Sequence, residues 1–319
     1  MTLLEAEIAF ILVATGIYLA LPVLTQYGLI NIHTQFYLPL ALLAGALASP
    51  TDPTAALAIK EEYKAEGHVT TTILGIAAFD DATGIINFSI ASAVSLAVLG
   101  KVGGGLGLTI LVPVAGIAMS VILGVMFAGL LILVARTVKD KGTLIVLILG
   151  ALFVCFGIAK FFKLNELLST MIFGCAIVNM AKDEEKFFIS IRDYLEEIIF
   201  VVFFVLAGAH LQPGILKSSI VIVLIFIALR TAGKVFGAFL GGMISKAPAN
   251  VKKYTAFGLI PQGGIVVGLA LLVRQNAAFS GISLILLNII LGTTVLHEFL
   301  GPLLTEMALK KAGEIRTEK

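Results

Sequence analysis

The sequence predicts an all-α membrane protein with about ten transmembrane helices arranged as an inverted repeat. Of its 319 residues, 59% are hydrophobic and only 13% are charged, a composition that soluble globular domains of this size do not have. Apolar runs of about 18 or more residues recur along the whole chain, and each is long enough to cross a bilayer. Because these runs are continuous rather than alternating, they predict helices instead of barrel strands. A net charge of +2 argues against nucleic acid as a partner.

Ten apolar runs predict the individual spans in chain order. The runs cover residues 7–29, 36–60, 69–99, 105–135, 143–162, 165–181, 196–212, 216–241, 254–274 and 281–309. The first run lacks a basic leader and a small-residue cleavage site, so we expect a retained span rather than a signal peptide. Charged and apolar residues recur at helical spacing over residues 182–197, which predicts an amphipathic helix on the cytoplasmic membrane surface.

The distribution of Lys and Arg predicts the orientation of these spans. Fifteen of the basic residues flank one face of the predicted bundle and five flank the other. Because basic residues near span ends are retained in the cytoplasm, we expect a multi-pass protein of the plasma membrane with both termini cytoplasmic. The chain then divides into a first core triplet at 1–99, connecting and scaffold spans at 100–181, the linker at 182–197, and a scaffold span with a second core triplet at 198–319.

Two of the predicted spans are interrupted in the middle. The second contains Pro50 and Pro53, with Asp52 between them, and the ninth contains Pro261 followed by a glycine pair. Backbone groups freed by such breaks are costly in lipid, so the breaks should be buried in protein or line a cavity. Interrupted spans at matching places in two halves indicate a transporter binding site. Spans one to three therefore pair with spans eight to ten as an inverted repeat with two discontinuous, crossing helices.

Acidic and basic residues at membrane depth predict the chemistry of this site. The third span carries the adjacent pair Asp80 and Asp81, and the eighth carries Arg230 and Lys234 on one helix face. Acids at such depth are costly without a partner or a function, and the two bases supply ion-pair or proton-relay partners. With Asp52 the interior holds three acids against two bases. One carboxylate is therefore left free to bind an ion.

These residues resemble the monovalent cation/proton antiporter superfamily, which includes the bacterial sodium/proton antiporters. The resemblance covers nearly the whole chain, through the motifs Ala48–Pro53, Phe79–Gly84, Phe203–Gly208, Arg230–Lys234 and Leu259–Gly264. It implies that Asp81 binds the transported cation and that Thr51 and Asp52 help to line the site. Asp81 and Asp52 would thus contact Na⁺ transiently. The resemblance also implies that Lys234 is the basic partner of Asp80.

The sequence departs from this family in three respects. The Thr51–Pro53 element resembles the electroneutral branch, whereas Asp80–Asp81 resembles the electrogenic branch. The ninth span carries Pro261–Gly263 where some relatives have Pro-Arg-Gly-Glu. Family members usually begin with two or three additional spans that help to form a dimer. The sequence therefore predicts a chain truncated at its N-terminus that is a homodimer at full length.

Four further polar residues lie within the predicted spans. Asn87 follows Asp80 by seven residues and so shares its helix face. We expect Asn87 and Gln262 to contact the ion-binding residues. His297 and Glu298 fall in the last apolar run. We expect their polar atoms to be satisfied by local contacts, and we do not expect these residues to line the ion path.

The function predicted from the sequence is secondary active exchange of Na⁺ or Li⁺ for H⁺ by alternating access. A buried carboxyl can hold either a proton or a partly dehydrated cation, so the two ions would compete for Asp81. No cofactor is expected. A K⁺/H⁺ antiporter of the same fold remains an alternative, because selectivity depends on cavity dimensions. An intramembrane aspartyl protease also uses two buried acids, but its Tyr-Asp and Gly-x-Gly-Asp contexts do not occur in this sequence.

Overall fold

The computed structural model describes residues 1–101, 105–138, 140–181, 187, 198, 201–202, 205, 208–209, 214 and 219–315, in which all regular secondary structure is helical. Eleven α-helices and three short 3₁₀ helices account for this part of the chain, and it contains no strand. The chain forms two compact units. Unit 1 comprises Met1–Gly103 and His210–Lys319, and unit 2 comprises Gly104–Ala209.

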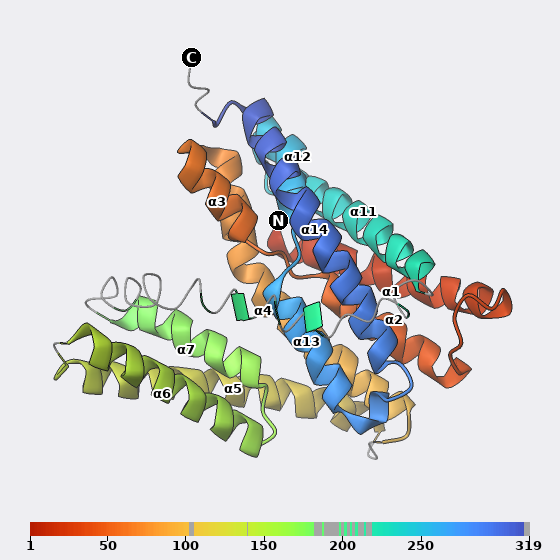
Figure 1. Ribbon diagram of the computed structural model, residues 1–319, viewed down its shortest axis with the longest axis horizontal. Helices are drawn as coiled ribbons and strands as arrows, with labels where there is room; N and C mark the ends of the chain where they lie inside the picture. The colour runs from red at the N-terminus through yellow and green to blue at the C-terminus, as the bar shows by residue number, and fades with distance from the viewer. Residues whose placement is uncertain are drawn as a thin grey trace. The chain divides into compact units, whose positions relative to one another are not determined.

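Unit 1 holds both ends of the chain and both interrupted spans (Figure 1). Its first half contains α1 (Thr2–Gln26), a 3₁₀ turn at Thr34–Phe36, α2 (Tyr37–Ala48), α3 (Thr54–Tyr63) and α4 (His68–Val98). Its second half contains α11 (Ile220–Ile244), α12 (Ala249–Tyr254), the 3₁₀ helix η2 (Thr255–Leu259), α13 (Gly264–Gln275), a 3₁₀ turn at Ala277–Phe279 and α14 (Ser283–Ala312). Each half thus places an interrupted span between two long helices.

Close contact between α1 and α11 depends on glycines spaced four residues apart on one face of α11. A Cβ atom at each of these glycines would lie 2.4 to 2.7 Å from a Cα atom of α1 or of Met1, which precedes it, closer than real Cβ contacts. The pairs are Gly233 with Ala9, Gly237 with Glu5, and Gly241 with Met1. Small residues at this spacing let two helix backbones approach in a membrane, where lipid supplies no hydrophobic force between helices. This approach brings the N-terminal end of α1 against the C-terminal half of α11.

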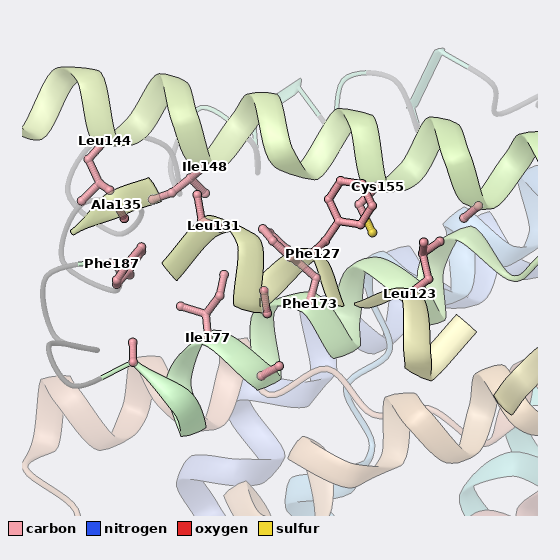
Figure 2. Close-up of a cluster of buried hydrophobic side chains, with 14 residues drawn as sticks. Leu123, Phe127, Leu131, Ala135, Leu144, Ile148, Cys155, Phe173, Ile177 and Phe187 are labelled. Carbon is pink, nitrogen blue, oxygen red and sulfur yellow. The ribbon is translucent and has the colours of Figure 1, made fainter. Parts of the chain in front are cut away.

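Unit 2 consists of α5 (Gly105–Ala135), α6 (Lys141–Phe161) and α7 (Glu166–Met180) around an apolar core. Figure 2 shows Phe127 and Leu131 of α5 packed with Phe173 of α7 and Ile148 of α6, all of them buried. Asp140 caps α6, because its carboxylate accepts a hydrogen bond from the backbone N–H of residue 143 at 2.7 Å. This bond lowers the pKa of Asp140 below its ordinary value.

The helices agree with most predicted spans, although their number stays a prediction. Six described helices are long and apolar enough to cross a membrane, and the pair Ala249–Leu259 and Gly264–Gln275, bent by 45°, would make seven. The segments Thr34–Ala48 and Glu166–Met180 are apolar but shorter. The motif Phe203–Gly208, the amphipathic linker predicted at 182–197 and the span predicted at 196–212 lie largely outside the described residues.

One predicted boundary is wrong in a way that matters for the site. The first span was expected to begin at residue 7, but α1 begins at Thr2 and includes Glu5. A charged residue at the start of an apolar run lowers the local hydropathy, so the run alone places Glu5 outside the membrane. The contact with α11 buries it completely.

Candidate functional site

The two unwound segments cross at the centre of unit 1. The first lies between α2 and α3, and the second lies between η2 and α13. The backbone N–H of Asp52 donates to the carbonyl of Pro261 at 3.1 Å. A Cβ atom at Gly263 would lie 1.7 Å from Oδ2 of Asp52, so this position has room for the carboxylate only because it is glycine. The Asp52 carboxylate also accepts from the backbone N–H of Thr54, the first residue of α3, at 2.8 Å.

Arg230 binds the main chain of both segments at the crossing. Its guanidinium donates to the carbonyls of Ala48 (3.1 Å), Pro50 (2.8 Å), Ile260 (2.6 Å) and Pro261 (3.3 Å). The last carbonyls of a helix lack intrahelical partners and carry partial negative charge. Arg230 is fully buried and satisfies these groups at both breaks. Its described hydrogen bonds all go to carbonyls, and its role as an ion-pair or proton-relay residue stays a prediction.

Lys234, one helical turn further along α11, binds carboxylates instead. Its Nζ atom lies 2.7 Å from Asp80 Oδ2 and 2.7 Å from Glu5 Oε2. It also donates to Oγ1 of Thr51 at 2.8 Å and to the carbonyl of Ser49. Thr51 Oγ1 in turn lies 2.7 Å from Asp80 Oδ2, to which it can donate. The side chains of Lys234, Asp80 and Glu5 are all 0% exposed.

Asp81 differs from its neighbour Asp80 although the two are adjacent in the sequence. Successive residues of a helix point about 100° apart, so only Asp80 reaches Lys234. Asp81 remains partly exposed, and within the described part of the chain its carboxylate makes no hydrogen bond. The charged groups that act on it are Asp80, Asp52 and Lys234. The described residues contain no group of three or more His, Cys, Asp or Glu side chains that could hold a metal ion.

The second half of unit 1 repeats the contacts of the first half with different residues. Pro50 lies against Gly84 of α4, where a Cβ atom on the glycine would be 2.2 Å from the proline ring. Pro261 lies against Gly301 of α14 in the same way, at 2.5 Å. The residue four positions before each glycine contacts the residue that follows each proline. These contacts are Asp80 with Thr51 at 2.7 Å and His297 with Gln262 at 2.9 Å.

The same correspondence extends to the carbonyls at the crossing. Thr51 Oγ1 lies 3.3 Å from the carbonyl of Leu259 in the second segment. Gln262 Nε2 donates to the carbonyl of Leu47 in the first at 2.9 Å. His297 was expected to be satisfied locally, but its ring contacts Gln262 at the crossing and is 1% exposed.

Asn87 lies behind the first segment. Its amide nitrogen is 3.2 Å from Oγ of Ser49 and 3.0 Å from Oε1 of Glu7 on α1. Ser49 is the residue whose carbonyl accepts from Lys234, so Asn87 reaches the site through one intervening residue.

Glu5 is the residue of this site that sequence reasoning missed. It precedes the first strongly apolar run, and nothing local distinguishes it from an acid at the membrane surface. A usable signal was the glycine spacing at positions 233, 237 and 241, which predicts a helix in close contact along the face that carries Lys234. That spacing does not say which helix makes the contact.

Comparison with known proteins places this geometry in a family. The family described as sodium/hydrogen exchanger, transmembrane, matches residues 2–311. Among solved structures, the chain is similar to the sodium proton antiporter MjNhaP1 from Methanocaldococcus jannaschii at pH 8, with a TM-score of 0.70 and 20% identity over 98% of this chain and 78% of that chain. This likeness shows the fold, and no curated protein matches.

The family match decides between the functional classes left open by the sequence. Sodium/hydrogen exchangers are secondary transporters and not enzymes, so the intramembrane protease alternative is wrong. The match covers nearly the whole chain, including both interrupted spans and every residue assigned to the site above. The chain therefore belongs to the sodium/hydrogen exchanger family of transmembrane antiporters.

Proposed function

We propose that this protein exchanges Na⁺ or Li⁺ for H⁺ across the plasma membrane, and that cation and proton compete for Asp81. The observation that carries the proposal is the different engagement of two adjacent acids at the crossing. Asp80 is buried and bound to Lys234, whereas Asp81 is partly exposed and makes no hydrogen bond within the described residues. A carboxylate that is near other charges but bound to none of them can accept either ion.

Other oxygen ligands for a cation are available near Asp81. Na⁺ is a hard cation and binds best to oxygen. Asp52 is one of the acids that act electrostatically on Asp81, and Thr51 Oγ1 contacts its neighbour Asp80. Thr51 and Asp52 belong to the unwound segment between α2 and α3. We therefore assign Asp81 and Asp52 as the charged ligands of the transported cation and Thr51 as a neutral ligand.

The inverted repeat supports alternating access as the transport mechanism. Two halves with matching contacts at the crossing can exchange conformations, so that the site opens first to one side of the membrane and then to the other. Because proton and cation exclude each other at Asp81, each reorientation carries one or the other. Cytoplasmic termini and a homodimeric full-length protein remain predictions that belong to this proposal.

Exchange by purified protein in liposomes tests the proposal. A pH-sensitive dye inside the vesicles should report proton movement when Na⁺ or Li⁺ is added outside. Addition of K⁺ tests the alternative of potassium/proton antiport. We expect Asp81→Asn to abolish exchange while the protein stays folded, and Glu306→Gln, at an acid paired with Lys310 near the surface of α14, to leave exchange unchanged. Exchange at the wild-type rate in Asp81→Asn would place the binding carboxyl elsewhere.

A further inference from the structure

A cavity of about 800 Å³ lies outside the ion site, between α11, α12, η2 and α14. These helices contact one another at the end of unit 1 where α11 and α14 end (Figure 1). The residues that line the cavity include none of those assigned to the ion site, and none of them is acidic. Its volume is within the range of cavities that hold a small molecule. The ion exchange described above gives this cavity no role.

One wall of the cavity is an apolar stripe of α11. Val235, Phe239 and Met243 recur every four residues, so they lie on one helix face, and their side chains are 39 to 53% exposed. At 1.5 Å per residue, this α11 stripe runs about 12 Å from the end of the helix toward its middle. Phe257 of η2 and Met307 of α14 also line the cavity. An exposed apolar stripe on a membrane-spanning helix suits a hydrocarbon chain.

Three lysines line the same cavity close to the helix ends. They are Lys252 and Lys253 of α12 and Lys311 of α14. Within the described part of the chain, none of the three pairs with a carboxylate. Lys310, the neighbour of Lys311, lies outside the cavity and pairs with Glu306. Three positive charges without an acid beside them favour binding of an anion.

Two contacts position the lysines of α12. The stem of Lys252 packs on α11, where a Cβ atom at Gly242 would lie 2.7 Å from its Cγ atom. The ammonium of Lys253 lies 5.2 Å from the centre of the Tyr254 ring. Tyrosine is enriched where headgroups meet hydrocarbon, and a lysine stem can cover apolar surface while its charge stays at that level. The distribution of Lys and Arg predicts that this end of unit 1 faces the cytoplasm, where the leaflet carries anionic lipids.

We propose that this cavity binds one anionic phospholipid, with its phosphate at Lys252, Lys253 and Lys311 and an acyl chain along the α11 stripe. A basic pocket between membrane helices is the kind of site that holds an anionic headgroup. The lysines alone would also attract free phosphate, but covering the apolar stripe requires a hydrocarbon chain. The headgroup contacts α12 and α14 and the chain contacts α11, so the lipid joins the three helices. This inference is independent of the ion that is exchanged.

A fluorescent reporter in the cavity tests the proposal. The sequence contains no tryptophan, so Phe257→Trp supplies a single one at the cavity wall. The full chain is reconstituted in phosphatidylcholine vesicles that contain a small fraction of phosphatidylglycerol or phosphatidylcholine with brominated acyl chains, which quench tryptophan on contact. Each lysine beside an anionic headgroup favours binding by about fivefold. We therefore expect half-maximal quenching at a mole fraction of brominated phosphatidylglycerol that is about 5-fold to about 100-fold lower than for brominated phosphatidylcholine.

Matched variants separate the cavity from the general attraction of lipid to a basic protein. Phe236→Trp is the control reporter, because Phe236 is exposed on α11 and does not line the cavity, and both lipids should quench it equally. Replacing the three cavity lysines by glutamine in Phe257→Trp should reduce the preference to about one, and arginine at the same positions should restore it. The charge-matched control replaces three exposed lysines outside the cavity by glutamine and should keep the preference. These are Lys60, Lys64 and Lys310.

Each outcome decides the inference. Equal quenching of Phe257→Trp by the two lipids overturns it and requires no lysine variant to fold. A preference that survives loss of the three cavity lysines overturns it too, as does quenching by neither lipid, which would show that protein covers the cavity. If Phe257→Trp does not fold, Met307→Trp provides a reporter in the same cavity, at a side chain that is 39% exposed. No ion flux is measured, so failure of this proposal leaves the proposed exchange untouched.

Discussion

Arg230 and Lys234 lie one turn apart on the same helix, and each binds the groups that its own chemistry suits. The guanidinium is a planar fork with five donors, and it spans four carbonyls at the two helix breaks. The ammonium is a compact charge, and it lies between two carboxyls. Exchanging these two side chains would leave carbonyls unsatisfied at one position and crowd the other.

Because two acids share Lys234, removing the lysine should lower the free energy of unfolding more than removing one of the acids. Lys234→Ala leaves two buried acids without their base, and breaking such a contact typically costs about 3 to 5 kcal/mol. Asp80→Asn should cost less, because Glu5 still holds the ammonium. The double variant should lose less than the sum of the single losses, which thermal unfolding in detergent can measure. Equal single losses, or strictly additive ones, would contradict the shared contact.

At the scale of elements, two kinds of glycine contact determine how the helices of unit 1 are placed. Glycines on α11 admit the backbone of α1, which carries Glu5 to Lys234. Gly84 of α4 and Gly301 of α14 each admit a proline of an unwound segment. The second contact positions the acids, because Asp80 and Asp81 lie four and three residues before Gly84. Helix placement and ion chemistry therefore depend on the same small residues.

A single methyl group on α11 should separate it from α1. In Gly237→Ala the new Cβ would lie 2.4 Å from Cα of Glu5, and a main-chain atom cannot move aside as a flexible side chain can. We expect a loss of about 1 to 3 kcal/mol of stability from overpacking, together with slower exchange. The control is Gly75→Ala on α4, where a Cβ meets nothing within 4 Å. That variant should be neutral or stabilising by up to about 1 kcal/mol, because alanine favours helix. Equal behaviour of the two variants would contradict the close approach.

At the scale of the whole molecule, every residue assigned to the site lies in unit 1. This unit is built from both ends of the chain, so its two groups of helices are separated in the sequence by Gly104–Ala209. Unit 2 has an apolar core of its own, made by α5, α6 and α7 (Figure 2). Ion binding should therefore stabilise contacts between distant parts of the sequence.

Stabilisation by the transported ion gives a prediction that does not depend on transport. A ligand that binds only the folded protein stabilises it by about 2.7 kcal/mol at about 100 times its dissociation constant. Na⁺ should therefore raise the melting temperature of the wild type above that in choline at equal ionic strength. The shift should be larger at high pH, because protons compete for the same carboxyl, and it should vanish in Asp81→Asn. A shift of the same size in that variant would show that Na⁺ binds elsewhere.

Patterns in the sequence were enough to predict the membrane class, the places where two spans break, and the pairing of those breaks in an inverted repeat. These properties follow from local patterns, since a run of apolar residues, a proline or a buried acid has the same meaning whatever lies opposite it. The pair of adjacent acids and the two bases one turn apart were also predicted in this way. Membership of the sodium/hydrogen exchanger family confirms the prediction of cation/proton antiport.

Only the tertiary structure decided which groups meet. Lys234 is 154 residues from Asp80 and further still from Glu5, and no local pattern specifies contacts over such distances. Arg230 was predicted to pair with an acid, and its described hydrogen bonds go to carbonyls freed at both breaks. Glu5 lies before the first predicted span, yet glycines on a helix more than 200 residues away bury it. The depth and partner of a charged side chain depend on the helix packed against it, which the chain's own order does not reveal.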